Sequence, residues 1–310
     1  MTRYDIAFDS AGVTCSGWHF PGEGDGYEQR PVVVMGHGFG GTKDSGLEPF
    51  AQRLSQAGLD VLAFDYRGFG ASEGEPRQTV SVVGQIHDFE SAVAAAKQLP
   101  GVDPNRIVLW GSSMSGGHVL RVASGRDDIA AVIAMTPLTS GAAVSRAAVA
   151  HRDVGTALKW TAIGLKSRVD VARGGRPTMM PLVAHPGEPG GLTLDGAYES
   201  YTALAGPTWR NEVDSAVGLQ IAGIRTADAA RRVRCPALFQ IADFDRYVPA
   251  DSVAKTAVLA RGVVHHYPCD HFDVWPGNGW FDKAADHQVA FLGRVLSTSS
   301  SPDRRKSPQR

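Results

Sequence analysis

The residues best suited to chemistry lie at 106–118, where an apolar run meets a turn rich in glycine and serine. Gly111 ends the apolar run, Ser113 follows two residues later, and small residues continue through Gly117. This pattern is typical of a strand that turns sharply into a helix, because only small residues let the two backbones approach closely. The turn exposes the hydroxyl of the serine at its apex, where a base can reach it. The pattern therefore indicates a nucleophile for acyl-transfer chemistry.

Three serines compete for the apex. Ser112 would place Trp110 two positions upstream, where the indole is too bulky for the bend. Ser115 would have small flanking residues and stays an alternative. Ser113 is preferred because it stands two residues after the glycine that ends the apolar run. The non-catalytic alternative is a loop that caps a helix.

A serine hydroxyl is a poor nucleophile at neutral pH, so the site needs a general base and a carboxylate that orients it. His271 is the candidate base because it follows the last predicted strand, which places it at the same sheet edge as the serine. His265 and His266 are competitors that fall within that strand. Asp243 and Asp245 both follow the preceding predicted strand, and loop position alone does not separate them.

The composition excludes several functional classes. The chain has 310 residues, 43% of them hydrophobic and 20% charged, with a net charge of −1. No block of like charges suggests nucleic acid or an anionic membrane as a partner. No apolar run approaches the ~18 residues of a membrane span, and the N-terminus lacks the apolar core of a signal peptide. Cys15, Cys235 and Cys269 are scattered and odd in number, which favours free thiols in a cytoplasmic protein.

Strands and helices alternate along most of the chain, which predicts a mostly parallel α/β sheet with right-handed crossovers. The predicted strands are residues 4–9, 13–20, 31–35, 59–64, 107–110, 131–135, 237–241 and 263–267. The predicted helices are residues 47–57, 80–99, 115–124, 249–260 and 282–296.

The alternation stops between residues 138 and 234. Helical patches at 155–165 and 214–224 flank a stretch rich in proline and glycine, and the whole is too long for a plain connection. We therefore expect a cap at 138–234, inserted between two parts of one core at 1–137 and 235–296. The tail at 297–310 is rich in serine, proline and basic residues and is expected to be disordered.

Four segments in this order resemble the α/β-hydrolase superfamily, across nearly the whole chain apart from the insertion. Residues 37–41 (HGFGG) are similar to its oxyanion loop, and residues 65–74 (DYRGFGASEG) to its D-x-R-G-x-G-x-S turn. Residues 111–117 resemble its nucleophile elbow, with Ser115 in place of the second glycine. The order of serine, aspartate and histidine also matches. The resemblance is closest to esterase-like members near the dienelactone-hydrolase and X-prolyl peptidase branch.

The resemblance implies roles for further residues. The family's acid stands four residues before a proline, which selects Asp245 by its distance from Pro249 and leaves Asp243 as the fallback. The backbone N–H groups of Phe39 and Met114 would stabilise the oxyanion, at about 3 kcal/mol per donor. In the turn at 65–74, Asp65 and Arg67 are expected to form a buried ion pair or loop anchor rather than to act in catalysis.

The predicted function is a serine hydrolase that cleaves a carboxylic ester of a small or medium, largely apolar acid through an acyl-enzyme on Ser113. The alternatives on the same residues are a thioesterase or acyltransferase, and a peptidase or amidase. A further alternative is a catalytically silent hydrolase fold that binds a ligand. The expected partner is a small-molecule acyl substrate, with no nucleic acid, metal or organic cofactor, and a homo-oligomer is compatible with the sequence.

Overall fold

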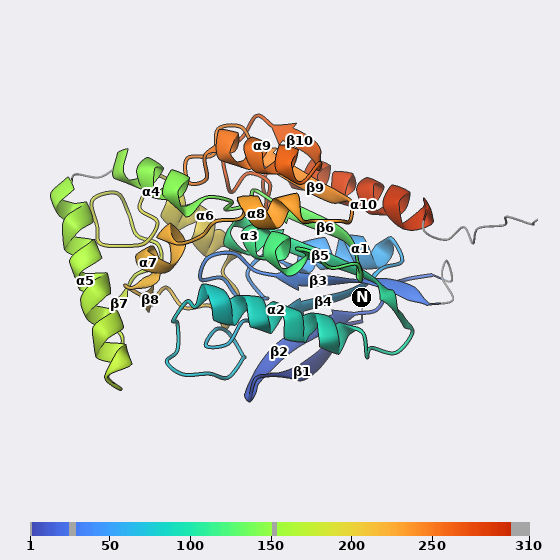
Figure 1. Cartoon of the computed structure of the whole chain (residues 1–310), viewed down its shortest axis with the longest axis horizontal. Helices are drawn as coiled ribbons and strands as arrows, with labels where there is room; N and C mark the ends of the chain where they lie inside the picture. The colour runs from blue at the N-terminus through green and yellow to red at the C-terminus, as the bar shows by residue number, and fades with distance from the viewer. Residues whose placement is uncertain (1, 25–28, 151–153, 299–310) are drawn as a thin grey trace, which may run out of the picture.

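An eight-stranded sheet runs through the centre of the molecule, in the order β1-β2-β4-β3-β5-β6-β9-β10 (Figure 1). The structure is a computed structural model that describes residues 2–24, 29–150 and 154–298. The strands are β1 (Tyr4–Ser10), β2 (Val13–Phe20), β3 (Arg30–Gly36), β4 (Asp60–Phe64), β5 (Val102–Ser112), β6 (Ile129–Met135), β9 (Ala237–Ala242) and β10 (Val263–Tyr267).

Strand direction divides the sheet into an antiparallel edge and a parallel body. β1 pairs antiparallel with β2, and β2 pairs antiparallel with β4. From β4 through to β10 every pairing is parallel. The carboxyl ends of these parallel strands meet at one edge, which is where ligands bind in open α/β sheets. The mostly parallel sheet predicted from the sequence is confirmed.

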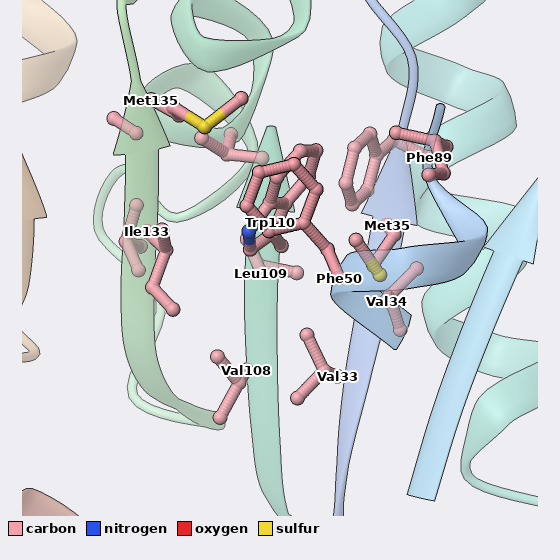
Figure 2. Packing of buried hydrophobic residues seen from close by; sticks show 14 of the residues in the cluster. Val33, Val34, Met35, Phe50, Phe89, Val108, Leu109, Trp110, Ile133 and Met135 are labelled. Carbon is pink, nitrogen blue, oxygen red and sulfur yellow. The ribbon is translucent and has the colours of Figure 1, made fainter. Parts of the chain in front are cut away.

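Helices cover both faces of the sheet. α1 (Glu48–Gln56) and α10 (Phe281–Thr298) contact each other over one face, whereas α2 (Val82–Ala96), α3 (Ser113–Val122) and α9 (Ala250–Leu259) lie on the other (Figure 1). Because both faces are covered, the central strands consist of almost continuous apolar residues. Figure 2 shows side chains of β3, β5 and β6 in this core, where the ring of Trp110 lies 5.4 Å from that of Phe50.

Most of the segment between β6 and β9, residues 138–234, lies beyond the carboxyl ends of the parallel strands, whereas its last helix returns to pack against α3 and α9 (Figure 1). We call residues 138–234 the inserted segment. Its strands β7 (Met179–Met180) and β8 (Val213–Asp214) form a small antiparallel pair. Its helices are α4 (Gly141–Ala150), α5 (Val154–Ala172), α6 (Ala197–Leu204), α7 (Val217–Ala222) and α8 (Ala227–Arg231).

The structure differs from the sequence-based expectation mainly in this segment. The sequence does not predict α4, α6 or α8. α6 and α8 are too short to show a clear period, and α6 buries just Ala197 and Tyr201. The helical patch expected at 214–224 is divided between β8 and α7. Elsewhere β10 has the predicted bounds, whereas α10 continues to Thr298. Of the tail predicted from residue 297, residues 299–310 lie outside the described residues.

Candidate active site

The turn at Ser113 has the sharp strand-to-helix geometry that the sequence predicts. β5 ends at Ser112 and α3 begins at Ser113, whose φ is +51°. This left-handed conformation is uncommon for a residue with a side chain and is characteristic of functional turns. A Cβ at Gly111 would lie 2.4 Å from the carbonyl oxygen of Ser115, so the bend requires glycine there.

Ser115, which replaces the usual second glycine, points into the core. Its buried hydroxyl lies 2.8 Å from the hydroxyl of Tyr66. A Cβ on Gly36 would lie 2.6 Å from Ser115 Oγ, so the absence of a side chain on β3 makes room for the extra serine. Ser112 is also buried, and its Oγ has no hydrogen-bond partner within the described part of the chain. The environments of these serines favour Ser113 as the apex residue.

His271 and Asp245 form a buried pair in the loops after β10 and β9. Nδ1 of His271 lies 2.6 Å from Oδ2 of Asp245, and the imidazole is almost fully buried. The other carboxylate oxygen of Asp245 accepts hydrogen bonds from the backbone N–H groups of Tyr247 and Val248, at 2.8 and 2.7 Å. These bonds hold the carboxylate against the imidazole and fix its orientation.

The pKa of His271 is raised above its ordinary value of 6.5. Burial on its own would lower this pKa, since it disfavours the imidazolium. The negative charge of Asp245 and its hydrogen bond to the imidazole outweigh that effect. The pair can therefore stabilise a proton that the imidazole accepts from a neighbouring group.

The competing residues lie in other environments. Asp243 pairs with His266, 2.6 Å from Oδ1 to Nδ1, in a position partly open to solvent. His265 stacks on His287 with ring centroids 3.9 Å apart. The structure thus brings Asp245, rather than Asp243, to His271.

Ser113 and His271 line a common cavity of about 40 Å³. The cavity lies against the loop at residues 37–46. This loop contains the segment 37–41 that resembles the family's oxyanion loop, and after that resemblance we call the whole loop the oxyanion loop. A Cβ on Gly38 would lie 3.2 Å from Cβ of Ser113, so the loop passes directly beside the turn. Phe39 contributes to the cavity wall, whereas the side chain of Met114 is fully buried. The residues that line the cavity are His37, Gly38, Phe39, Gly41, Ser45, Ser112, Ser113, Leu192, Tyr201, Leu204, His271, Phe272 and Trp275.

A buried ion pair joins the oxyanion loop to the residue that directly follows β4. Both the backbone N–H and Nζ of Lys43 lie 2.6 Å from carboxylate oxygens of Asp65, and both side chains are buried. Asp65 is therefore a loop anchor, but its partner is not Arg67, which pairs instead with Asp88 of α2. The sequence does not reveal Lys43, because nothing local links it to a carboxylate elsewhere in the chain.

The inserted segment also supplies residues that the sequence does not reveal. Leu192, Tyr201 and Leu204 reach the cavity from this segment. These three residues follow no regular spacing in the sequence, so no pattern predicts that the fold brings them to the site.

Within residues 2–24, 29–150 and 154–298, no three histidine, cysteine or acidic side chains are grouped so that they could hold a metal ion. No helix in these ranges is long and apolar enough to cross a membrane.

Comparison with known proteins identifies the family. The sequence model of Hydrolase_4, described as serine aminopeptidase, S33, matches residues 27–265. The chain belongs to this family of α/β hydrolases. It is 35% identical over 295 residues to the quorum-quenching protein AidA of Acinetobacter baumannii, with 94% of this chain and 95% of that protein covered.

One further sequence relative and one solved structure extend the comparison. The chain is 32% identical over 311 residues to the polyketide transferase af380 of Aspergillus fumigatus, covering 96% of this chain and 99% of the relative. The crystal structure of the α/β hydrolase GrgF from Penicillium sp. sh18 superposes with a TM-score of 0.79 at 24% identity, covering 96% of this chain and all of that one. The α/β-hydrolase fold expected from the sequence is confirmed.

Proposed function

We propose that this α/β hydrolase cleaves carboxylic esters through an acyl-enzyme intermediate on Ser113. The observation that carries the proposal is the cavity that Ser113 shares with His271, whose Nδ1 is hydrogen-bonded to the buried carboxylate of Asp245. A hydroxyl at a strained turn, a base and an orienting acid are the three groups that acyl transfer requires.

In the proposed first step, Oγ of Ser113 bonds to the ester carbonyl carbon while its proton moves to Nε2 of His271. The carbonyl electron pair moves onto the oxygen, and the resulting imidazolium is stabilised by Asp245. The intermediate then collapses: the bond to the alcohol oxygen breaks, and His271 returns the proton to that oxygen. Water repeats the sequence on the acyl-enzyme, which releases the acid and restores the serine.

The negative oxygen of the intermediate needs preorganised donors. Met114 lies in the first turn of α3, where backbone N–H groups have no partner within the helix. Its N–H is therefore free to bind an anion, and the helix dipole favours negative charge there. The N–H of Phe39 in the oxyanion loop is the proposed second donor. Each would contribute about 3 kcal/mol to transition-state stabilisation.

The cavity walls support an apolar acyl group of small or medium size as the substrate. Leu192 and Leu204 of the inserted segment and Phe272 and Trp275 of the core form these walls. Such walls favour an apolar group, and the volume of about 40 Å³ favours a short one; no lysine or arginine among the described residues lines the cavity to pair with an anionic chain.

Hydrolysis of p-nitrophenyl acetate and butyrate tests the proposal. We expect turnover by the natural sequence and its loss in Ser113→Ala and His271→Ala. A fluorophosphonate probe followed by peptide mapping should place the label on Ser113. A protein as inert as these variants would instead support the silent, ligand-binding alternative, and label on Ser115 would contradict the assignment of the nucleophile.

A second candidate, acyl transfer or thioester cleavage on the same residues, is supported by the similarity to the polyketide transferase af380 over nearly its full length. Paired oxygen esters and thioesters of increasing chain length, assayed with and without an alcohol or amine acceptor, separate these activities. The family description, serine aminopeptidase, makes aminoacyl p-nitroanilides the substrates that test the peptidase alternative.

A further inference from the structure

Tyr201 of the inserted segment holds the carbonyl group next to a proposed oxyanion donor. Its hydroxyl donates a hydrogen bond to the carbonyl oxygen of Phe39, 2.5 Å away. A carbonyl can only accept, so the direction of this bond is unambiguous. The bond joins α6 directly to the oxyanion loop.

The ring of Tyr201 is fixed from two sides. It stacks on Trp209 with ring centroids 5.5 Å apart, and its edge packs against Phe272 at 5.8 Å. Phe272 is the residue after His271. One buried side chain therefore touches the oxyanion loop at its hydroxyl and the base-bearing loop at its ring.

Other residues of the inserted segment close around the same part of the loop. A Cβ on Gly40, which has a φ of +60°, would lie 1.6 Å from a methyl carbon of Leu182. A Cβ on Gly191 would lie 3.1 Å from the ring of Phe39. The peptide unit after Phe39 is thus covered by the inserted segment rather than by solvent.

The sequence around Phe39 explains why contacts that restrict this loop matter. Glycines at positions 38, 40 and 41 leave the backbone on either side of Phe39 with wide conformational freedom. An oxyanion donor is effective only if its N–H is already aimed when charge develops. The C=O and the N–H of Phe39 belong to consecutive peptide units that are joined by only two rotatable bonds. A hydrogen bond that holds the carbonyl therefore narrows the range of directions open to the N–H.

We propose that Tyr201 is a positioning residue for the oxyanion hole, which makes the inserted segment part of the catalytic apparatus as well as a wall of the cavity. This inference rests on the proposed function. It assigns to Tyr201, besides its place in the cavity wall, an effect on the transition state that is transmitted through the backbone of Phe39.

The test compares Tyr201→Phe with the matched control Tyr198→Phe. Tyr198 lies on the same helix, and its ring contacts that of His185 at a centroid distance of 4.4 Å in a tilted arrangement. Because Tyr201→Phe keeps the ring contacts, the fold should be retained. Circular dichroism and a melting curve test this. With p-nitrophenyl butyrate, we expect kcat of Tyr201→Phe to fall about 10-fold, less than the 10²–10³ lost with a whole donor. KM should stay within about twofold.

A second readout separates positioning from a general loosening of the site. Butylboronic acid bonds to the serine oxygen and becomes tetrahedral and negatively charged, with one oxygen where the oxyanion would lie. Its inhibition constant should rise in Tyr201→Phe by about the same factor as kcat falls. In Tyr198→Phe both quantities should match the natural sequence.

The outcomes distinguish the two proposals. If the natural sequence neither turns over p-nitrophenyl esters nor reacts with a fluorophosphonate, the proposed function itself fails. If it is active and Tyr201→Phe has the same kcat and the same boronate inhibition, only the role of Tyr201 is overturned. A rise in KM with unchanged kcat would likewise overturn it, since that pattern indicates lost ground-state binding.

Discussion

Removing the hydroxyl of Ser115 should destabilise the fold without removing the nucleophile. Its hydroxyl and that of Tyr66 are 2.8 Å apart, and both residues are fully buried. In Ser115→Ala the phenol loses this partner where water cannot replace it, so the free energy of unfolding should fall by about 1–3 kcal/mol. Tyr66→Phe should cost a similar amount, because it leaves the serine hydroxyl unpaired.

The double variant sharpens the prediction. Removing both hydroxyls leaves no unpaired group. The free energy of unfolding lost in the double variant should therefore be smaller than the sum of the losses in the two single variants, by about 1–2 kcal/mol. Urea unfolding followed by tryptophan fluorescence measures each term. Ser112→Ala is the matched control, since Ser112 Oγ is buried without a partner among the described residues and its loss should cost little. Additive losses would refute the bond, and loss of fluorophosphonate labelling in Ser115→Ala would refute the structural role of that serine.

Two further predictions concern pH. The pKa of His271 is raised above 6.5, and a base must be neutral to accept a proton, so kcat/KM should fall in acid with a midpoint above 6.5. Asp245→Asn should move this midpoint to lower pH, because burial alone lowers the pKa of His271. It should also reduce kcat by up to ~10⁴-fold. An unmoved midpoint would contradict the assignment of the acid. Burial raises the pKa of Asp60, but hydrogen bonds from His19 and Arg30 lower it below 3.8 overall. The stability from this group is therefore present above pH 3.8 and lost as the pH falls through the native pKa, so Asp60→Asn should show weaker acid destabilisation in urea titrations from about pH 5 to about pH 2. Equal pH dependence would count against this pairing.

Much of the core could be predicted because its signals are local. Continuous apolar runs identify β3, β4 and β6, since strands covered on both faces have no polar side to interrupt them. The small residues around Ser113 are required by steric contacts within a few positions of the chain. The placement of His271 after the last strand follows from parallel strand order, which brings distant loops to one edge.

The residues that the sequence does not reveal depend on contacts between distant segments. Lys43 pairs with Asp65 because the fold buries both, and neither neighbourhood in the chain indicates that pairing. Tyr201 lies on an eight-residue helix whose apolar face is too short to show a period. The bounds of the inserted segment and the roles of Ser113, Asp245 and His271 stay predictions that the proposed assays address.

The proposed acid, Asp245, follows β9, and the proposed base, His271, follows β10. These two strands pair at one margin of the sheet. During synthesis, these strands and the loops after them leave the ribosome later than the turn at Ser113, the oxyanion loop and the inserted segment. If the proposed roles hold, a growing chain in which they have not yet docked carries the serine but not the residues that would take its proton, and should therefore be inactive. For the same reason, fraying of this one margin in the mature protein would remove base and acid together and leave the middle of the sheet intact.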